Sequence, residues 1–385
     1  MEDRRSFLAL MASAGSAVTT QGTAVAIRSS AHGRVAGRTD RIIINSCGGF
    51  DVTDDLRQVD AEDPPPGSGI DPHKIEDALA SGMTAANQTV GYVLGSEEPY
   101  EATVRELALW ELIFRHEPRL LKVYAAADID RAERERSLGI VLGFQNAAQL
   151  GTQLDRVDTF AALGVRIIQL TYNHQNLLGG GALTPGNPGL TPFGQEVVAK
   201  LNQRRIIIDL SHSGAQLCLD SARASVRPVA ISHTGCRAIA DHPRNTADET
   251  LRLVASRGGY VGIYFMPFLT TGRTATAEDL LAHLEQAIDV CGEDHVGIGT
   301  DGGTSAINIQ KARAGNAKQH AKRVAAGIAA PGESADTLNF IPELSGPGQF
   351  QTLAVLLQRR GHSSGRIEKI LGRNFLRFAK EIWGA

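Results

Sequence analysis

The sequence lacks several features that mark common classes of protein. No apolar run approaches the ~20 residues that a membrane-spanning helix needs. Lysine and arginine total 39 against 42 acidic residues, a net charge of −3, so the excess of positive charge expected of a dedicated nucleic-acid binder is missing. The four cysteines have no C-x-x-C spacing, which excludes a zinc ribbon or a thioredoxin motif. They are Cys47, Cys218, Cys236 and Cys291.

The sequence does contain enough apolar material for a large buried core. The chain has 385 residues, of which 42% are hydrophobic, and its 41 glycines are spread along it rather than gathered in low-complexity tracts. This length exceeds an ordinary domain but suits one large α/β barrel.

The first residues resemble a twin-arginine export signal. Arg4 and Arg5 precede a weakly hydrophobic stretch rich in Gly, Ala and Ser, and a small-residue candidate cleavage site follows at Ala24-Val25-Ala26. The alternative is a basic terminus without a targeting role, because Arg-Arg pairs also arise by chance. The order of the segments favours an export signal over residues 1–26, a linker over 27–39 and a periplasmic mature protein, in which a disulfide is permitted.

From about residue 40, short runs rich in β-branched residues alternate with longer amphipathic segments. This pattern is typical of βα units and of parallel strands that are buried on both faces. Strands are expected at residues 41–45, 121–126, 139–144, 165–171, 205–210, 227–232, 259–265 and 295–301. Helices are expected at residues 102–115, 153–162, 194–203, 247–256 and 277–290.

Eight strands with intervening helices predict a single (β/α)8 barrel of the TIM type over residues 40–385. The alternative is a doubly wound open sheet, which is disfavoured because no glycine-rich fingerprint follows the first strand. After Asp301, a stretch rich in Gly, Ala and Pro predicts a long loop to about Pro347. Two closing helices are expected at residues 349–359 and 364–383.

In such barrels the chemistry is carried by side chains at the carboxyl ends of the strands. His212 and His233 follow two consecutive strands in similar settings, Asp-Leu-Ser-His and Ala-Ile-Ser-His. Neighbouring parallel strands lie ~4.8 Å apart, so both imidazoles can reach one metal ion. The alternative is a pair of hydrogen-bonded histidines without a metal.

Three more residues at these strand ends are candidates. Asp301, within Gly-Thr-Asp-Gly-Gly, stands where a barrel places a general acid/base or a further metal ligand, although Asp-Gly also caps turns. Arg244 offers a two-pronged donor for a carboxylate or an oxyanion, unless it is a solvated surface charge. Asn173, before the glycine-rich loop 179–181, is a weaker candidate for shaping a substrate pocket.

Together these residues resemble the membrane (renal) dipeptidase family, metallopeptidases that cleave dipeptides on a (β/α)8 barrel with two zinc ions. The matching stretches are residues 170–173, 189–194, 208–212, 228–233, 244–248, 297–301 and 367–375. The resemblance runs from about residue 40 to the C-terminus. It implies zinc as the cofactor and a dipeptide or peptide-like small molecule as the ligand.

The resemblance also implies a role for each matched residue. His212 and His233 match the two histidines that bind the second zinc. Arg244 matches the arginine that holds the substrate or its tetrahedral intermediate, and Asp301 matches the aspartate proposed as the proton shuttle. Asn173 falls near a substrate-contacting histidine of better-known members, which this chain lacks.

The sequence departs from the family at the other metal ligands. The family's first strand ends in His-x-Asp, which supplies two ligands of the first zinc, but Cys47 and Gly49 stand in those places. Gln145 replaces the glutamate that bridges both metals, and a neutral amide bridges two dications poorly. Of the five ligands that the family pattern implies, two remain. Three aspartates just beyond the first strand are candidate substitutes: Asp51, Asp54 and Asp55.

We therefore expect a metal-dependent dipeptidase-like hydrolase with one zinc ion at most, held by His212 and His233 with Asp301 or Cys47. The replaced ligands favour an alternative, a catalytically impaired relative that binds a peptide-like ligand or acts in maturation in the periplasm. Hydrolysis is expected to be weak while ligand binding remains. No nucleic-acid partner or transmembrane segment of the mature protein is expected, and a homodimer is left open.

The export signal gives a direct prediction. Replacing both Arg4 and Arg5 with lysine is expected to leave precursor in the cytoplasm, because the twin-arginine route reads the arginine pair. Cell fractionation measures the mature protein in the periplasm, and an unchanged periplasmic yield would contradict the prediction.

Overall fold

The fold is known from a computed structural model that describes residues 41–50, 69–325, 327 and 329–384. The expected export signal and linker lie outside these residues, and so do the candidate ligands Asp51, Asp54 and Asp55. Of the described helices, none is long and apolar enough to cross a membrane.

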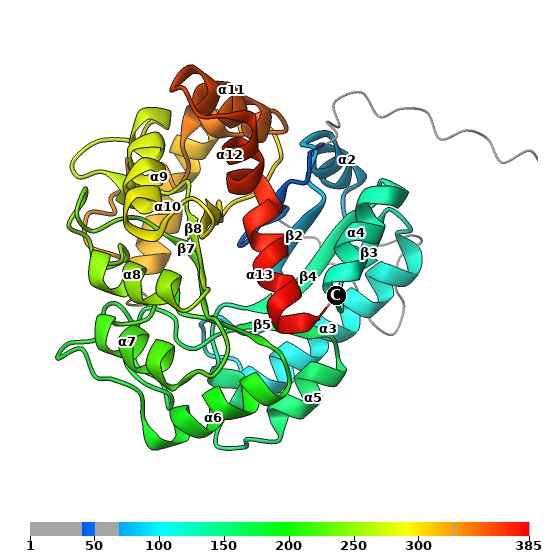
Figure 1. Cartoon of the computed structure of the whole chain (residues 1–385), viewed down its shortest axis with the longest axis vertical. Helices are drawn as coiled ribbons and strands as arrows, with labels where there is room; N and C mark the ends of the chain where they lie inside the picture. The colour runs from blue at the N-terminus through cyan, green and yellow to red at the C-terminus, as the bar shows by residue number, and fades with distance from the viewer. Residues whose placement is uncertain (1–40, 51–68, 326, 328, 385) are drawn as a thin grey trace, which may run out of the picture. The chain divides into compact units, whose positions relative to one another are not determined.

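Eight parallel strands form the centre of the fold (Figure 1). In spatial order they are β1 (Ile44–Asn45), β2 (Ala85–Thr89), β4 (Leu138–Phe144), β5 (Val165–Gln169), β6 (Ile207–Asp209), β7 (Ala230–Thr234), β8 (Tyr260–Ile263) and β9 (Val296–Ile298). The first and last strands meet, because the Ser46 amide donates to the Ile298 carbonyl at 3.0 Å and Gly48 pairs with Gly302. The predicted (β/α)8 barrel is confirmed.

The predicted second strand is wrong. Residues 121–126 overlap β3 (Leu120–Lys122), which pairs with β4 away from the ring, and β2 takes the second place in the barrel. The sequence of β2, Ala-Ala-Asn-Gln-Thr, has no apolar run and little β-propensity. Its polar side chains form hydrogen bonds with other segments: the side-chain NH2 group of Asn87, for example, donates to the Ser46 carbonyl at 2.8 Å.

Helices surround the ring, and the last of them close one of its ends. They are α2 (Pro72–Ala80), α3 (Pro99–His116), α4 (Ala126–Glu135), α5 (Arg156–Ala162), α6 (Pro192–Gln203), α7 (Ala215–Ala224), α8 (Asp248–Ser256), α9 (Ala277–Cys291), α10 (Ile309–Ala325), α11 (Gln349–Arg359), α12 (Ser364–Glu368) and α13 (Asn374–Trp383). Short 3-10 turns occur at Ala148–Leu150, Pro267–Leu269 and Pro342–Leu344. Side chains cap the N-terminal ends of several helices. At α9, the Thr276 hydroxyl accepts from the backbone amide of Asp279, and the Asp279 carboxylate accepts from the backbone amide of Thr276, which forms a capping box.

The five predicted inter-strand helices are confirmed as α3, α5, α6, α8 and α9, with small differences at their ends. The long loop predicted after Asp301 is wrong in part, because α10 occupies residues 309–325. Ala, Lys, Gln and Arg dominate α10, so its helical propensity is high, but it lacks the apolar stripe that reveals a helix packed on a core.

The closing helices seal the end of the barrel opposite the carboxyl ends of the strands. A π-helical turn, Lys369–Arg373, joins α12 to α13, and α13 crosses the ring (Figure 1). Phe375 packs edge-to-face on Tyr260 of β8 with ring centroids 5.2 Å apart. Gly372 lets the π-helical turn lie close to the chain around β1, since a Cβ there would lie 2.6 Å from the Ile42 carbonyl oxygen. The carboxyl ends are therefore left as the open mouth.

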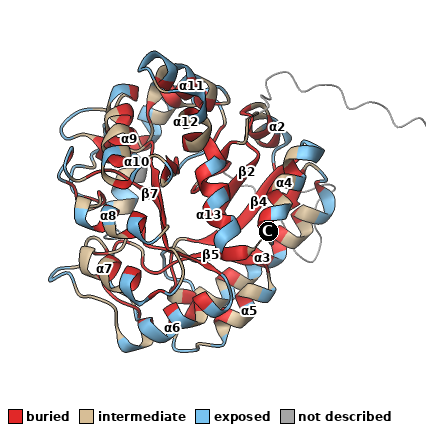
Figure 2. Cartoon of the chain, in the orientation of Figure 1, coloured by how far each residue is buried: buried red, intermediate tan, exposed pale blue. Residues whose placement is uncertain are grey.

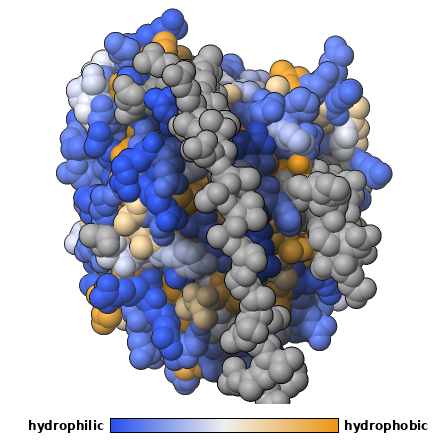
Figure 3. Space-filling model, turned by 90° about the vertical axis from the view of Figure 1, so that its right-hand side faces the viewer, coloured by the Kyte–Doolittle hydropathy of each residue, from blue (hydrophilic) through white to orange (hydrophobic). Residues whose placement is uncertain are grey.

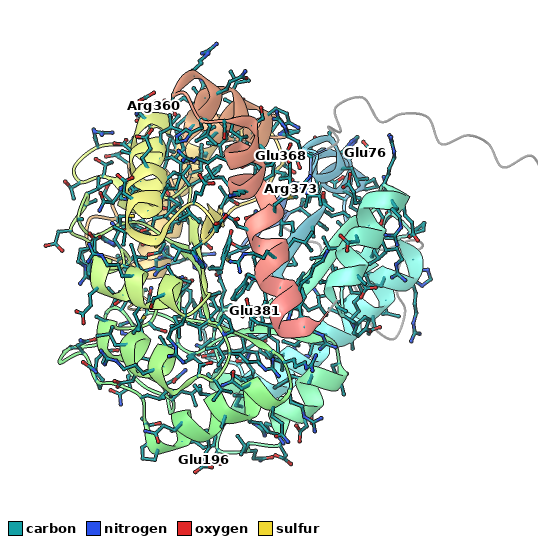
Figure 4. The ribbon with its side chains drawn as sticks, in the orientation of Figure 1. Glu76, Glu196, Arg360, Glu368, Arg373 and Glu381 are labelled. Carbon is teal, nitrogen blue, oxygen red and sulfur yellow. The ribbon has the colours of Figure 1, made fainter. Side chains whose placement is uncertain are left out.

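The pattern of buried and exposed residues agrees with this barrel architecture (Figure 2). The strands and the inner helix faces are buried, and the outer helix faces are exposed. The face drawn in Figure 3 is mostly hydrophilic, with hydrophobic residues in small separate patches. Charged side chains on the outer helices pair locally, as Arg373 and Glu368 do at 2.8 Å (Figure 4). All four cysteines are buried and free, so no disulfide forms.

Candidate metal centre

Side chains from four strand ends converge at the mouth of the barrel. Cys47 follows β1, His212 follows β6, His233 lies in β7 and Asp301 follows β9. Donor atoms of Cys47, His233 and Asp301 all lie within 4.8 Å of one another. The rings of His212 and His233 have centroids 4.9 Å apart. Zinc binds such donors at ~2.0–2.3 Å, so Cys47, His233 and Asp301 are close enough together to share one ion, and the His212 ring lies next to that of His233.

The carboxylate of Asp209, at the end of β6, fixes the two histidine-bearing corners. It is 2% exposed and accepts hydrogen bonds from the amides of Ser211 and Ser232 at 3.0 and 2.9 Å. It also accepts from both serine hydroxyls, at 2.8 and 2.5 Å. In return, the Ser211 hydroxyl accepts from the His233 amide at 3.0 Å. Since β6 and β7 share a single pair, Asp209 with Ala230, this network replaces the missing backbone pairing.

The same network sets which nitrogen of His233 carries the proton. The Ser232 hydroxyl gives its one proton to Asp209, so its 2.9 Å bond to His233 Nδ1 requires an Nδ1–H donor. His212 Nδ1 donates to Asn173 Oδ1 at 2.7 Å in the same way. Both Nε2 atoms thus carry a lone pair, and both are buried with no hydrogen-bond partner among the described residues.

Electrostatics keep these imidazoles neutral. Burial lowers the pKa of His212 well below its ordinary value, and the positive charge of Arg244 lowers it further. Burial also lowers the pKa of His233, although Asp301 opposes the shift. Neutral imidazoles with free Nε2 atoms and hydrogen-bonded Nδ1 atoms are the form that binds metals.

Three residues of the site have left-handed backbones. Asn173, His212 and Asp301 have φ of 53°, 59° and 55°. Residues other than glycine seldom adopt this conformation, and it costs of order 1 kcal/mol or more at each position. The surrounding hydrogen bonds hold them there, which indicates that the directions of these side chains matter.

The side of the site that carries Cys47 is filled by neutral amides. Gln145 Nε2 donates to Cys47 Sγ and to Asp301 Oδ1, both at 3.1 Å. At Gly49, an added Cβ would lie 2.5 Å from Gln88 Oε1, so Gln88 occupies the space that an aspartate there would need. Burial raises the pKa of the Cys47 thiol well above its ordinary value, and Asp301 raises it further, so this thiol ionises only beside a cation.

Arg244 borders the centre on the other side. It is 4% exposed, its guanidinium carbon lies 5.9 Å from the centroid of the Tyr264 ring, and its Nη2 atom has no partner among the described residues. Together with His212 it lines a cavity of about 320 Å³. A buried guanidinium with a free donor is suited to a carboxylate or an oxyanion.

The structure therefore brings together at one mouth those residues singled out from the sequence that it describes. Asn173 contacts His212, and its role in substrate binding stays a prediction. Asp209 was missed as a functional residue. The available signal was the repeated Ser-His corner after two consecutive strands, but the shared carboxylate beneath both corners is visible only in three dimensions.

Comparisons with known proteins agree with this geometry. The family model described as membrane dipeptidase (peptidase family M19) matches residues 73–312, more than half of the chain. The chain belongs to the membrane dipeptidase family. This family consists of metallopeptidases, so the convergence of metal-binding side chains at the barrel mouth is expected of a member.

Individual relatives extend the match along most of the chain. A crystal structure of an amidohydrolase from Pseudomonas aeruginosa is 30% identical, with a TM-score of 0.75, and the match covers 90% of this chain and 98% of that one. An uncharacterized protein in the pqqA 5′ region of Klebsiella pneumoniae is 28% identical, over 74% of this chain and 98% of that protein. Dipeptidase tcpJ of Claviceps purpurea is 26% identical, over 73% of this chain and 60% of that protein.

Asp209 gives a prediction for this family member. In Asp209→Asn, a side-chain NH2 group faces N–H and O–H groups that now donate to the carboxylate. Because donors then face donors, the free energy of unfolding should fall by about 2 kcal/mol. Metal affinity should fall by about 10–100-fold, because the imidazoles lose their support. Denaturant unfolding and metal titration measure the two effects.

The matched control is Glu196→Gln on the exposed surface of α6 (Figure 4), which removes one carboxylate without touching the centre. It should leave both quantities unchanged. An Asp209→Asn variant that unfolds at the wild-type denaturant concentration would show that the network is dispensable.

Proposed function

We propose that this chain is a metal-dependent dipeptidase-like hydrolase with a single zinc ion. His212 and His233 would hold the ion through Nε2 with Cys47 as the third donor, which leaves one position for water and leaves Asp301 beside the ion as a proton carrier. The observation that carries the proposal is the pair of buried Nε2 atoms without a partner among the described residues, beside donor atoms that lie within 4.8 Å of one another. Imidazole, thiolate and carboxylate are the ligands that zinc takes in proteins.

One ion is proposed rather than two because the other half of the family's site is filled. Gln88 takes the space beside Gly49, and Gln145 directs its NH2 group at Cys47 and Asp301. A group that donates hydrogen bonds to two candidate ligands is a supporting neighbour of an ion, not a bridge between two ions.

Bound zinc supplies an acidified water and polarises an amide carbonyl. The chain's own groups supply the rest of the chemistry. Arg244 offers its free Nη2 donor to a carboxylate or to the oxyanion, and Asp301, half-buried at the rim, takes and returns a proton. The ligand in this proposal is a dipeptide or a peptide-like amide.

A second function is supported by the number of donors. If all four donors bind at once, a tetrahedral zinc has no open position for water, and catalytic sites keep such a position. The chain would then be a catalytically impaired member that binds a peptide-like ligand or serves in maturation. We further propose that it acts in the periplasm, which rests on the arginine pair at its N-terminus.

Metal content tests the proposal directly. After dialysis, we expect at most one equivalent of zinc per chain, and His212→Ala or His233→Ala should abolish it, since a site this small cannot spare an imidazole. Elemental analysis measures the content, and His116→Ala, at an exposed histidine of α3, is the matched control. Two equivalents that survive dialysis would contradict the single-ion proposal.

Restoring the family's ligands tests the activity. Cys47→His, Gly49→Asp and Gln145→Glu together should raise zinc content and dipeptide hydrolysis in parallel. Adding Gln88→Ala should increase the gain, because Gln88 Oε1 lies where a side chain introduced in place of Gly49 would begin. Gln88→Ala alone in the wild type should change neither quantity. If the unmodified protein already turns over dipeptides at ~10 s⁻¹, the inference from the replaced ligands is wrong.

A further inference from the structure

The cavity that His212 lines is positively charged, and none of the other candidate ligands, Cys47, His233 and Asp301, lines it. It is bounded by the loops that follow β6 and β7 and by the first turns of α7 and α8. Its lining includes two arginines, Arg237 and Arg244, and among the described residues no aspartate or glutamate lines it. Its volume of about 320 Å³ is at the small end for a ligand site.

Both arginines have donors to spare. Arg244 is 4% exposed, and its Nη2 atom has no partner among the described residues. Arg237 has a buried Nε atom without a hydrogen-bond partner in that part of the chain, and its Nη2 atom makes only a long 3.5 Å bond to the His242 carbonyl. The nearby carboxylate of Asp241 is 3.8 Å from Arg237 Nε and 94% exposed, so it competes weakly.

The start of α7 adds to the positive potential. Gly214 precedes the helix and has no side chain to cap it, and the first turn contains no acidic residue. Gly214 and Ala215 both line the cavity. Asn187 accepts from the Gln216 amide at 3.1 Å, so one of the first-turn donors is already used. The helix start, which has no acidic residue and only one amide accounted for by Asn187, favours an anion in the cavity, and the buried Arg244 donor favours the same kind of ligand.

The start of α8 behaves differently. Asp248 and Glu249 stand in its first turn and supply their own negative charge to that helix end. The anion-binding capacity of the cavity therefore comes from Arg237, Arg244 and α7. Two guanidinium groups match a ligand with two carboxylates better than a ligand with one.

We infer that this cavity binds the carboxylates of an acidic C-terminal residue, so that the preferred ligand is a dipeptide ending in aspartate or glutamate. The inference rests on the proposed function, in which the peptide amide lies at the metal centre beside His212. Arg244 takes one carboxylate of the terminal residue, and Arg237 with the start of α7 takes the other. Arg237 thus determines specificity.

Binding of three dipeptides tests the inference. Ala-Asp carries the proposed acidic group, Ala-Asn is its neutral isostere, and Asp-Ala has the same net charge as Ala-Asp with the acid on the other residue. Calorimetry on the wild-type protein, with chromatography to verify that the peptides stay intact, should show Ala-Asp binding about tenfold tighter than either, the size of one charge-assisted hydrogen bond.

Two variants locate the effect. Arg237→Gln should reduce the preference for Ala-Asp over Ala-Asn to less than about twofold, chiefly by weakening Ala-Asp binding, because the second carboxylate loses its charged partner. Arg223→Gln, an exposed arginine near the end of α7, removes the same charge away from the cavity and should keep the wild-type preference.

The binding of the three dipeptides to the wild-type protein tests the inference even if Arg237→Gln fails to fold. Equal binding of Ala-Asp and Ala-Asn would overturn the inference, and equal binding of Ala-Asp and Asp-Ala would overturn it in favour of general charge attraction. Zinc analysis of the same samples separates the two proposals. A protein without metal that still prefers Ala-Asp contradicts the single-zinc proposal, whereas a zinc-loaded protein without the preference contradicts the acidic-ligand inference.

Discussion

The buried carboxylate of Asp209 is the interaction on which the site depends. Four hydrogen bonds from Ser211 and Ser232 end on it, and they join two strands that share only one backbone pair. A buried charge is tolerated when its acceptor sites are satisfied, and it is costly when they are not. These hydrogen bonds hold the two serine-histidine corners in an arrangement that satisfies the carboxylate, and in it the imidazole rings lie next to each other with centroids 4.9 Å apart.

The division of the barrel into a sealed end and an open end follows from the C-terminal helix. Phe375 and Phe378 of α13 pack on Tyr260 at the start of β8, with ring centroids 5.2 and 5.9 Å away. This packing supplies apolar burial at one end, so polar and strained residues can gather at the other. The left-handed backbones of His212 and Asp301 are found at that open end.

The sequence predicted the barrel because its strands are apolar runs, and it predicted the histidine pair because the two corners follow consecutive strands. It could not reveal β2, whose polar residues are stabilised by contacts with distant segments, such as that of Asn87 with Ser46. It could not reveal Gln88 as the occupant of the space beside Gly49, since that depends on how two strand ends face each other. Local patterns report burial and periodicity, whereas the filling of a site depends on tertiary packing.

The charge balance of the site explains why Cys47 and Gln145, which replace two of the family's ligands, are compatible with each other. Cys47 and Asp301 supply two negative charges when the thiol is ionised, and the neutral His212 and His233 supply none, so one divalent ion gives a centre with no net charge. A second dication would leave two uncompensated positive charges in a site that already faces Arg244, and burying unpaired charge costs several kcal/mol. The family's anionic bridge would offset part of that cost, but Gln145 cannot, because its amide is neutral and its NH2 group faces the ligands. The replacements are thus consistent with one another and with the proposal of a single ion.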